Sequence, residues 1–196
     1  MATYRAVAAV SRAMLKLLED GCPRAEFPNA QFELQQALDF QKGPFGEGLS
    51  LFLYRVAING SRRARPGRIE PDGRRFRPAL PLDLYYALCL WGRSVDVQQR
   101  LLGYVMRTFE DVPILPPGLL NQHGPESTTF GAHEAVELVG DPLAVQDLHL
   151  LWDLLKPNVP LIITYVARVV AIDSEIAITE GGLVQTRVFD MAGGPA

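Results

Sequence analysis

The three histidines and two cysteines of the chain are the residues best suited to bind a metal ion or start nucleophilic chemistry. His133 and Glu134 begin like the His-Glu-x-x-His motif of zinc proteases, but no second histidine follows one helical turn later. The surrounding sequence also alternates like a strand, on which two ligands could not share a helix face. Cys22 and Cys89 lie in apolar surroundings and do not indicate a disulfide framework. We therefore expect two reduced thiols, no metal site and no cofactor.

Other polar groups that could support catalysis also lack the required context. The glycine-rich segment Gly43–Gly48 precedes a strand and has no Gly-Lys-Ser/Thr, whereas a phosphate-binding loop opens a helix. Ser127, Thr128 and Thr129 lie near His133 in sequence, but a polar loop explains them better than a nucleophile and its base. Acidic pairs occur at the ends of predicted elements, where carboxylates are normally solvated: Glu19 with Asp20, Glu110 with Asp111, and Asp173 with Glu175. The sequence gives no argument for an enzyme.

The segment 59–80 carries the most distinctive charge of the chain. Its seven arginines face only Glu70 and Asp72, which gives a local charge of 7 − 2 = +5. Such a segment is either a solvated loop, a contact for nucleic-acid phosphates, or a docking site for an acidic protein surface, whose carboxylates the guanidinium fork binds bidentately. Phe76 is its only aromatic residue, so base stacking is not supported. The arginines are Arg62, Arg63, Arg65, Arg68, Arg74, Arg75 and Arg77.

The composition of the whole chain is that of an ordinary globular protein. It has 196 residues, of which 48% are hydrophobic and 21% charged, and this length predicts one domain. The net charge is −3, so no global attraction to nucleic acid or to an anionic membrane is expected. No apolar run approaches the roughly 18 residues of a membrane span, and Arg5, Arg12 and Lys16 interrupt the first segment. We expect a soluble protein without a secretory signal.

The first half of the chain predicts a helix followed by strands. Apolar residues at helical spacing predict a helix over residues 3–19. Residues 29–41 contain a weaker strand signal, and Leu49–Ile58 is a strong strand with two apolar faces, which predicts a central position in its sheet. Six glycine and proline residues exclude a regular element from 59–80, and a long mobile loop is expected there. Leu82–Trp91 alternates like a strand.

The second half predicts two helices and three strands. Asp96, with Gln99 three residues later, is expected to cap a helix that ends before Pro113. An irregular stretch then extends to about Thr129, and Asp141 with Pro142 is expected to start a helix that ends at Leu155. The predicted strands are Ala132–Val139, Leu161–Ile172 and Leu183–Phe189.

These elements predict an α+β fold. We expect a single domain over residues 1–190, built from a mixed, mostly antiparallel sheet packed with two to three helices. The basic loop 59–80 is an insertion in this domain, and residues 191–196 form a short flexible tail.

Several stretches together resemble a known protein family. They are Leu51–Val56 with Asn59, Pro78–Leu88, Gln98–Arg107 with Pro113, and Leu151–Leu155 followed by Pro157, Pro160 and Tyr165–Val170. Their order and spacing are similar to those of the cap, or tail-terminator, proteins of phage-tail-like extracellular contractile injection systems of the antifeeding-prophage and virulence-cassette kind. The resemblance spans roughly residues 5–175. The arginine-rich insertion and the end of the chain after Glu175 depart from the family pattern.

The resemblance implies a structural protein and not an enzyme. Proteins of this family form a ring of six that terminates the tube and sheath at the end opposite the baseplate. The implied partners are other copies of this chain, the sheath protein and the inner tube protein, with no membrane and no nucleic acid. The implied location is the bacterial cytoplasm during assembly, from which the protein can leave as part of the particle.

Two segments are the predicted protein interfaces. We expect the arginine loop to dock on an acidic rim of the tube or sheath. Contractile sheaths link their subunits by added strands, so an open strand edge in the cap could receive the last arms. By this analogy either Leu161–Ile172 or the last predicted strand is the acceptor edge, and the polar alternation of the latter favours it. Its residues are Leu183, Val184, Gln185, Thr186, Arg187, Val188 and Phe189.

Three alternatives remain open at this point. The chain could be another tail-completion or baseplate component of the same kind of particle. It could also be a nucleic-acid-binding module that uses the arginine loop, in which case binding would weaken steeply with salt. An unrecognised hydrolase has only isolated polar residues in its support.

Overall fold

The fold was obtained as a computed structural model, which describes residues 2–42, 46–63, 66–122, 128–158 and 160–178. It is an α+β domain with one mixed sheet of six strands and four α-helices among the described residues. The helices are α1 (Ala6–Asp20), α2 (Val95–Asp111), α3 (Pro117–Gln122) and α4 (Val145–Leu155), with short 3-10 turns η1 (Asp39–Lys42) and η2 (Gly60–Arg62). The strands are β1 (Gln31–Leu34), β2 (Gly48–Ile58), β3 (Leu80–Trp91), β4 (Ile114–Leu115), β5 (Val136–Gly140) and β6 (Leu161–Ile172).

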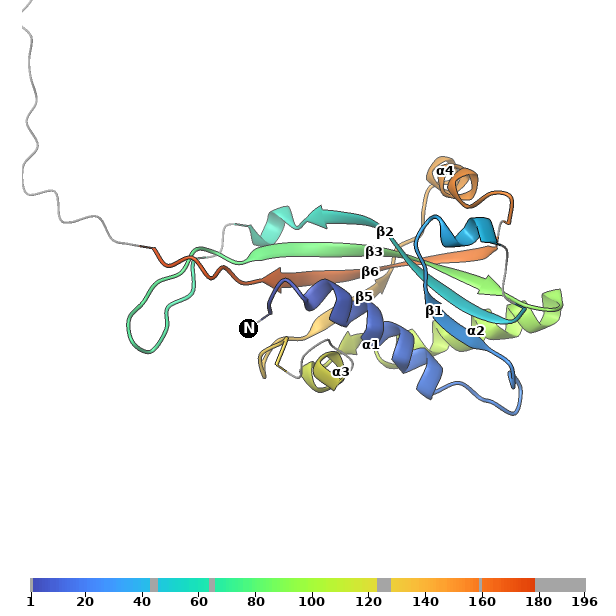
Figure 1. The fold of residues 1–196 in the computed structure, drawn as a ribbon, viewed down its shortest axis with the longest axis horizontal. Coiled ribbons are helices and arrows are strands. Elements are labelled where there is room, and N and C mark those ends of the chain that lie inside the picture. Colours follow the sequence, from blue (N-terminus) through green and yellow to red (C-terminus); the bar gives the residue numbers. More distant parts are fainter. Residues whose placement is uncertain (1, 43–45, 64–65, 123–127, 159, 179–196) are drawn as a thin grey trace, which may run out of the picture.

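The sheet has the order β1-β2-β3-β6-β5-β4, and only β1 and β2 pair in parallel. The prediction of a mixed, mostly antiparallel sheet is therefore confirmed. The 12-residue strands β3 and β6 form its long centre and run along the length of the molecule (Figure 1). Both strands carry apolar residues on both of their faces. This composition fits a central position, because a strand inside a sheet that is covered on both faces needs apolar side chains on each face.

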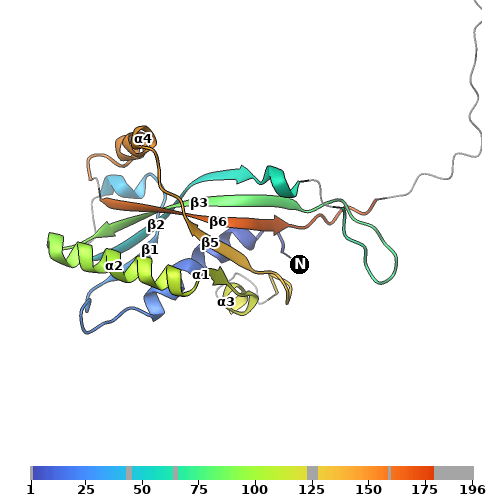
Figure 2. The ribbon, with the colours of Figure 1, turned by 180° about the vertical axis from the view of Figure 1, so that it is seen from behind.

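One face of the sheet carries the main hydrophobic core. Helices α1, α2 and α3 lie on this face, as Figures 1 and 2 show from opposite sides. Small residues such as Ala9 and Ala13 let α1 approach the sheet closely, and Met14 and Leu18 fill the space beside them. Tyr86 of β3 is fully buried here, and its hydroxyl lies 2.8 Å from the Ser11 hydroxyl of α1.

The opposite face is covered at one end only. There α4 and η1 lie over a second, smaller core made by Phe40, Phe52, Cys89, Trp91 and Leu155 among others. The Trp91 indole N–H donates to the Ser50 hydroxyl at 2.6 Å, which satisfies the polar atom of this buried ring. The rest of this face has no helix over it within the described residues (Figure 2).

The predicted strands Leu49–Ile58, Leu82–Trp91 and Leu161–Ile172 and the predicted helix 3–19 are confirmed, with ends that differ by at most three residues. Of the predicted strand 29–41, only β1 is a strand, and η1 follows it. The number of helices was predicted one too low, because the six-residue α3 follows two prolines in the stretch that was expected to be irregular. The two-residue strand β4 lies in the same stretch.

The predicted starts of two helices are wrong. Helix α2 is capped by Ser94, whose hydroxyl accepts the Val97 N–H at 3.3 Å, while Asp96 lies in the first turn and pairs with Arg100. Helix α4 begins at Val145 and not at Asp141. The reason is that Asp141 is still bound to β6: its N–H donates to the Thr164 carbonyl, and the Thr164 hydroxyl donates to the Asp141 carbonyl.

The strand predicted over Ala132–Val139 begins four residues late, at Val136. Ala132 and His133 form a turn, and the Glu134 carboxylate accepts the backbone N–H groups of Ala2 and Gly131. This carboxylate therefore holds the start of the chain against the turn, which is the role the structure gives to the Glu of the incomplete protease motif.

Candidate assembly surfaces

Residues 66–78 form a two-stranded turn that we call the arginine arm. It projects beyond the end of the sheet, at the same end as the last described residues of the chain (Figure 1). The Phe76 N–H donates to the Arg68 carbonyl at 2.8 Å, and the Glu70 N–H donates to the Arg74 carbonyl at 2.9 Å. Gly73 closes the turn with a φ of +85°, a conformation that favours glycine. The expectation of a loop without a regular element is confirmed for residues 66–78, which contain isolated bridges and no strand, and is wrong only for the short turn η2.

Residues 173–178 leave β6 and run beside the arm as a third extended segment. Phe76 forms an antiparallel bridge with Ala177, and the Ile178 N–H donates to the Arg75 carbonyl at 2.7 Å. The Arg77 N–H donates to the Ile176 carbonyl at 3.1 Å. The arm is therefore tied to the chain that follows the last described strand.

Phe76 gives the arm a small core of its own. Only 8% of its surface is exposed, although the arm projects from the domain. The Arg68 guanidinium lies 4.2 Å from the centre of its ring and the Arg74 guanidinium 5.8 Å, both within the range of cation–π attraction. Arg68 also pairs with Glu70, and Arg74 with Asp72 at 2.6 Å. Hydrogen bonds from the Arg74 N–H and guanidinium lower the pKa of Asp72.

These two ion pairs divide the seven predicted arginines into two groups. Arg68 and Arg74 are neutralised within the arm and build its shape. Arg62, Arg63, Arg75 and Arg77 are exposed, and Arg65 lies outside the described residues. The net charge of the segment 59–80 is 7 − 2 = +5, and these four exposed arginines lie on the arm and on the η2 turn that leads into it. These arginines therefore lie on a segment whose backbone is held by hydrogen bonds.

A half-buried carboxylate, that of Asp83, fixes the base of the arm. The Asn59 amide N–H₂ donates to both oxygens of Asp83, at 3.1 and 3.0 Å, and the Val169 N–H donates to one of them at 2.9 Å. The Asn59 side-chain oxygen also accepts the Arg62 N–H at 3.1 Å and so caps η2. Val169 has a φ of +59°, which is rare for a β-branched residue, and it lies where the pairing of β3 and β6 shifts register. Asp83 thus joins β2, β3 and β6 at one point.

The predicted acceptor edges have different outcomes. Leu161–Ile172 is wrong as an edge over residues 165–168, because β6 lies between β3 and β5 there; its two ends pair with β3 alone among the described strands. Leu183–Phe189 lies outside the described residues, and its role as an interface stays a prediction.

The open edge that the structure does show is the second half of β2. β1 pairs only with residues 48–51 of β2, so residues 53–58 have a neighbour on the β3 side alone within the described chain. Val56 and Ile58 are each 49% exposed there. The prediction that β2 is central therefore holds only for its first half. The sequence did not predict this edge, because both faces of the strand are apolar. The only residues that indicate exposure are Arg55 within the strand and Asn59 directly after it.

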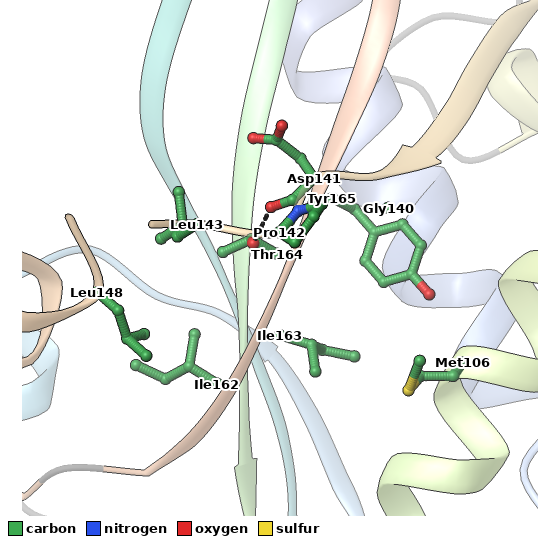
Figure 3. A pocket seen from close by; sticks show the side chains of 10 residues that line it. All are labelled: Met106, Gly140, Asp141, Pro142, Leu143, Leu148, Ile162, Ile163, Thr164 and Tyr165. Atoms are coloured by element: carbon green, nitrogen blue, oxygen red, sulfur yellow. Dashed lines mark hydrogen bonds between the residues drawn. The ribbon is translucent and has the colours of Figure 1, made fainter. Parts of the chain in front are cut away.

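The described residues also enclose an apolar hollow of about 360 Å³ between β6, the end of β5 and α4 (Figure 3). Asp141 is the only carboxylate that lines it, and Tyr165 is the only phenol, whose pKa is raised by burial. No nucleophile lies beside a base in this set, so the hollow could take an apolar side chain but offers no catalytic arrangement. Its lining residues are Met106, Gly140, Asp141, Pro142, Leu143, Leu148, Ile162, Ile163, Thr164 and Tyr165.

Among the described residues, no cluster of three or more His, Cys, Asp or Glu side chains could hold a metal ion. Cys22 and Cys89 are free and buried, and burial raises the pKa of the Cys89 thiol to about 12. None of the helices in the described part of the chain is long and apolar enough to cross a membrane.

A family model described as the Pvc16 N-terminal domain matches residues 9–186, which is most of the chain. The chain belongs to this family. The resemblance found in the sequence is thereby confirmed, and the matched range includes the arginine arm and the open edge of β2. A comparison with curated protein sequences finds no match.

Two solved structures share the fold. One is the sheath/tube terminator of an extracellular contractile injection system (PVC) in its extended state, with a TM-score of 0.58 and 16% identity; the alignment covers 96% of this chain and 65% of that one. The other is the tube-terminating cap of the anti-feeding prophage, with a TM-score of 0.54 and 17% identity, covering 95% of this chain and 60% of that one. This chain therefore spans less than two thirds of the length of these solved chains, and the likeness shows a terminator fold.

Proposed function

We propose that this protein is a structural cap that terminates the tube and sheath of a contractile injection system. The observation that carries the proposal is the match of nearly the whole chain to two terminator structures, together with its membership of the Pvc16 N-terminal domain family. In this proposal the cap is a ring of six copies at the end opposite the baseplate, formed in the bacterial cytoplasm and released with the particle.

A cap must bind the last ring of the particle without offering a copy of the surface that it binds. A tube of stacked rings otherwise grows without limit, because each ring presents again the surface to which the next one adds. The chain supports this asymmetry in its shape: the arginine arm projects from one end of the sheet only (Figure 1). We propose that the exposed arginines of the arm and of η2 bind an acidic rim of the last tube or sheath ring.

The arm is suited to this docking because its own ion pairs fix its shape before binding. Arg68 and Arg74 are engaged with Phe76 and with two carboxylates of the arm. A partner therefore meets guanidinium groups on an ordered support, which lowers the entropy cost of forming bidentate pairs with carboxylates.

The proposal is tested by replacing the four described exposed arginines of this surface, Arg62, Arg63, Arg75 and Arg77, with alanine. A matched control replaces four exposed arginines elsewhere, Arg12, Arg100, Arg107 and Arg168, and so removes the same charge. Particles are assembled with each variant and their lengths and ends are examined by electron microscopy. We expect particles of irregular length without an end cap for the arm variant and normal particles for the control.

Two results would contradict the proposal. Normal capped particles in the complete absence of the protein would show that it is not the terminator. Capped particles with the arm variant would show that the arm is not the docking site. A nucleic-acid-binding role for the arm would instead appear as DNA or RNA binding that falls steeply with salt and is lost in the arm variant alone.

A further inference from the structure

We propose that the open edge of β2 receives the C-terminal segment Leu183–Phe189 of a neighbouring copy as an added strand. This inference rests on the proposed function, because it explains how copies of the cap are joined into a ring. It assigns an acceptor, residues 53–58, and a donor on the same chain, so that each copy can both give and receive a strand.

The acceptor is an edge that a protein does not normally leave uncovered. Residues 53–58 of β2 have no strand partner on their outer side within the described chain, and the edge carries neither proline nor lysine. Val56 and Ile58 pair with Leu84 and Leu82 of β3, so they lie on the same face of the sheet as the main core. Both are 49% exposed. An added strand would cover them.

The other edges of the sheet are poorer acceptors. The outer edge of β1 is only four residues long and includes the exposed Gln31 and Glu33, and β4 has only two residues. The ends of β6 that β5 leaves without a second described strand, residues 161–163 and 169–172, are only three and four residues long. Short and charged edges are the usual means by which proteins prevent strand addition. The second half of β2 is therefore the edge that most requires a partner.

The donor follows from the sequence beyond the last described residue. The segment Leu183–Phe189 consists of residues typical of strands, with Val184, Thr186 and Val188 on one face. Gly181 and Gly182 precede it and Gly193 and Gly194 follow it, and glycines are typical of flexible linkers, so in this proposal the segment pairs away from its own domain. It is long enough to match the six open residues of β2.

The geometry favours a neighbouring copy over the same chain. Ile178 is hydrogen-bonded to Arg75 in the arm, six residues beyond the end of β6, or about 20 Å at the rise of an extended chain. The outer side of β2 lies three strand spacings from β6, about 14 Å. A strand that returned to its own β2 would have to start about 24 Å from Ile178, and the five residues to Leu183 span at most about 17 Å.

The test uses cysteines at the centre of each segment, so that it works for either strand direction. One variant of the full chain carries Val56→Cys and a second carries Thr186→Cys, while the native cysteines are buried and remain. The two variants are mixed and treated with a short thiol-specific cross-linker. We expect a dimer that joins the two variants, whose yield falls on dilution and when an excess of the chain with native Val56 and Thr186 is added as a competitor.

Matched controls decide the outcome. Leu150→Cys on α4, which is 68% exposed, and Leu34→Cys on the competing edge of β1, which is 44% exposed, replace Val56→Cys in parallel mixtures. Equal cross-linking to either control overturns the proposal, and so does the absence of cross-linking. Cross-linking that forms only within a chain carrying both cysteines, independently of dilution, also overturns it, because the tail then binds its own domain.

Failure of this inference can be told from failure of the proposed function. If Val56→Lys, which places a charge on the edge, prevents association but particles remain capped, strand exchange is present without being required for capping. If the cross-link forms but particles are capped without the protein, the strand exchange stands and the terminator function fails. If capping depends on the protein and no cross-link forms, only the strand exchange is wrong.

Discussion

At the scale of single residues, the Asp83 carboxylate of β3 joins Asn59 of the η2 cap to the backbone of Val169 in β6. Its two oxygens accept three hydrogen bonds, and one of them satisfies the N–H of a residue held at a φ of +59°. Removal of the carboxylate leaves this N–H without its acceptor inside the sheet, and it also frees the Asn59 amide.

We therefore expect Asp83→Ala to lower the free energy of unfolding by about 3 kcal/mol, since hydrogen bonds to charged groups contribute about 1.5–3 kcal/mol and an unsatisfied partner adds to the loss. Urea unfolding followed by circular dichroism measures the change. The control is Asp96→Ala, whose carboxylate pairs with Arg100 on an exposed helix surface and should change stability by less than about 0.5 kcal/mol. An equal effect of the two substitutions would contradict the role given to Asp83.

Contacts of single side chains were the feature that the sequence predicted least well. The absence of the second histidine after His133 could be read directly from the sequence, whereas Asp83 could not be found. Its partners lie 24 and 86 positions away, and no local pattern encodes a contact over such separations. The ion pairs that Arg68 and Arg74 form within the arm were missed for a related reason. They depend on the fold of the arm around Phe76, which the sequence pattern does not contain.

At the scale of elements, the arginine arm depends on Phe76. This ring is the only large side chain buried in the arm, and it holds Arg68 in place while bridging to Ala177. We expect Phe76→Ala to open the arm while the domain stays folded, because the main core lies elsewhere. Hydrogen exchange should show lost protection of the N–H groups of Phe76 and Ile178, with unchanged protection in β3.

The same variant separates the shape of the arm from its charge. Phe76→Ala keeps all seven arginines, so a docking surface that needs only positive charge would still cap particles. Because we propose that docking needs an ordered support, we expect capping to be impaired. Normal capping by a variant whose arm is shown to be open would contradict that part of the proposal.

Elements with a strong local pattern were predictable, and elements defined by distant contacts were not. The limits of β6 were predicted correctly, since twelve residues with two apolar faces leave little choice. The start of α4 was not, because Asp141 and Pro142 form a good helix start locally but are bound to Thr164 of β6. The order of the strands, and with it the open half of β2, follows from tertiary pairing that periodicity does not contain.

At the scale of the whole molecule, the described residues form two hydrophobic cores. The main core joins α1, α2 and α3 to the sheet, and the smaller core under α4 and η1 shares β2 and β3 with it. Two cores that share their central strands are expected to unfold together. In our proposal the segment after Ile178 serves only association.

We therefore expect a chain that ends at Ile178 to unfold in one transition, with the same slope in urea and a free energy of unfolding within about 0.5 kcal/mol of the full chain when both are dilute. At high concentration the two should differ: the full chain gains stability by mass action as copies associate, and the shortened chain does not. Urea unfolding at several protein concentrations, with sedimentation velocity on the same samples, measures both effects.

A shortened chain that unfolds at much lower urea even when dilute would show that the tail belongs to its own domain, because only an intramolecular contact stabilises a protein independently of its concentration. Equal concentration dependence in the two chains would show that association uses another surface, and the exposed leucines of α4 would then be the first place to look.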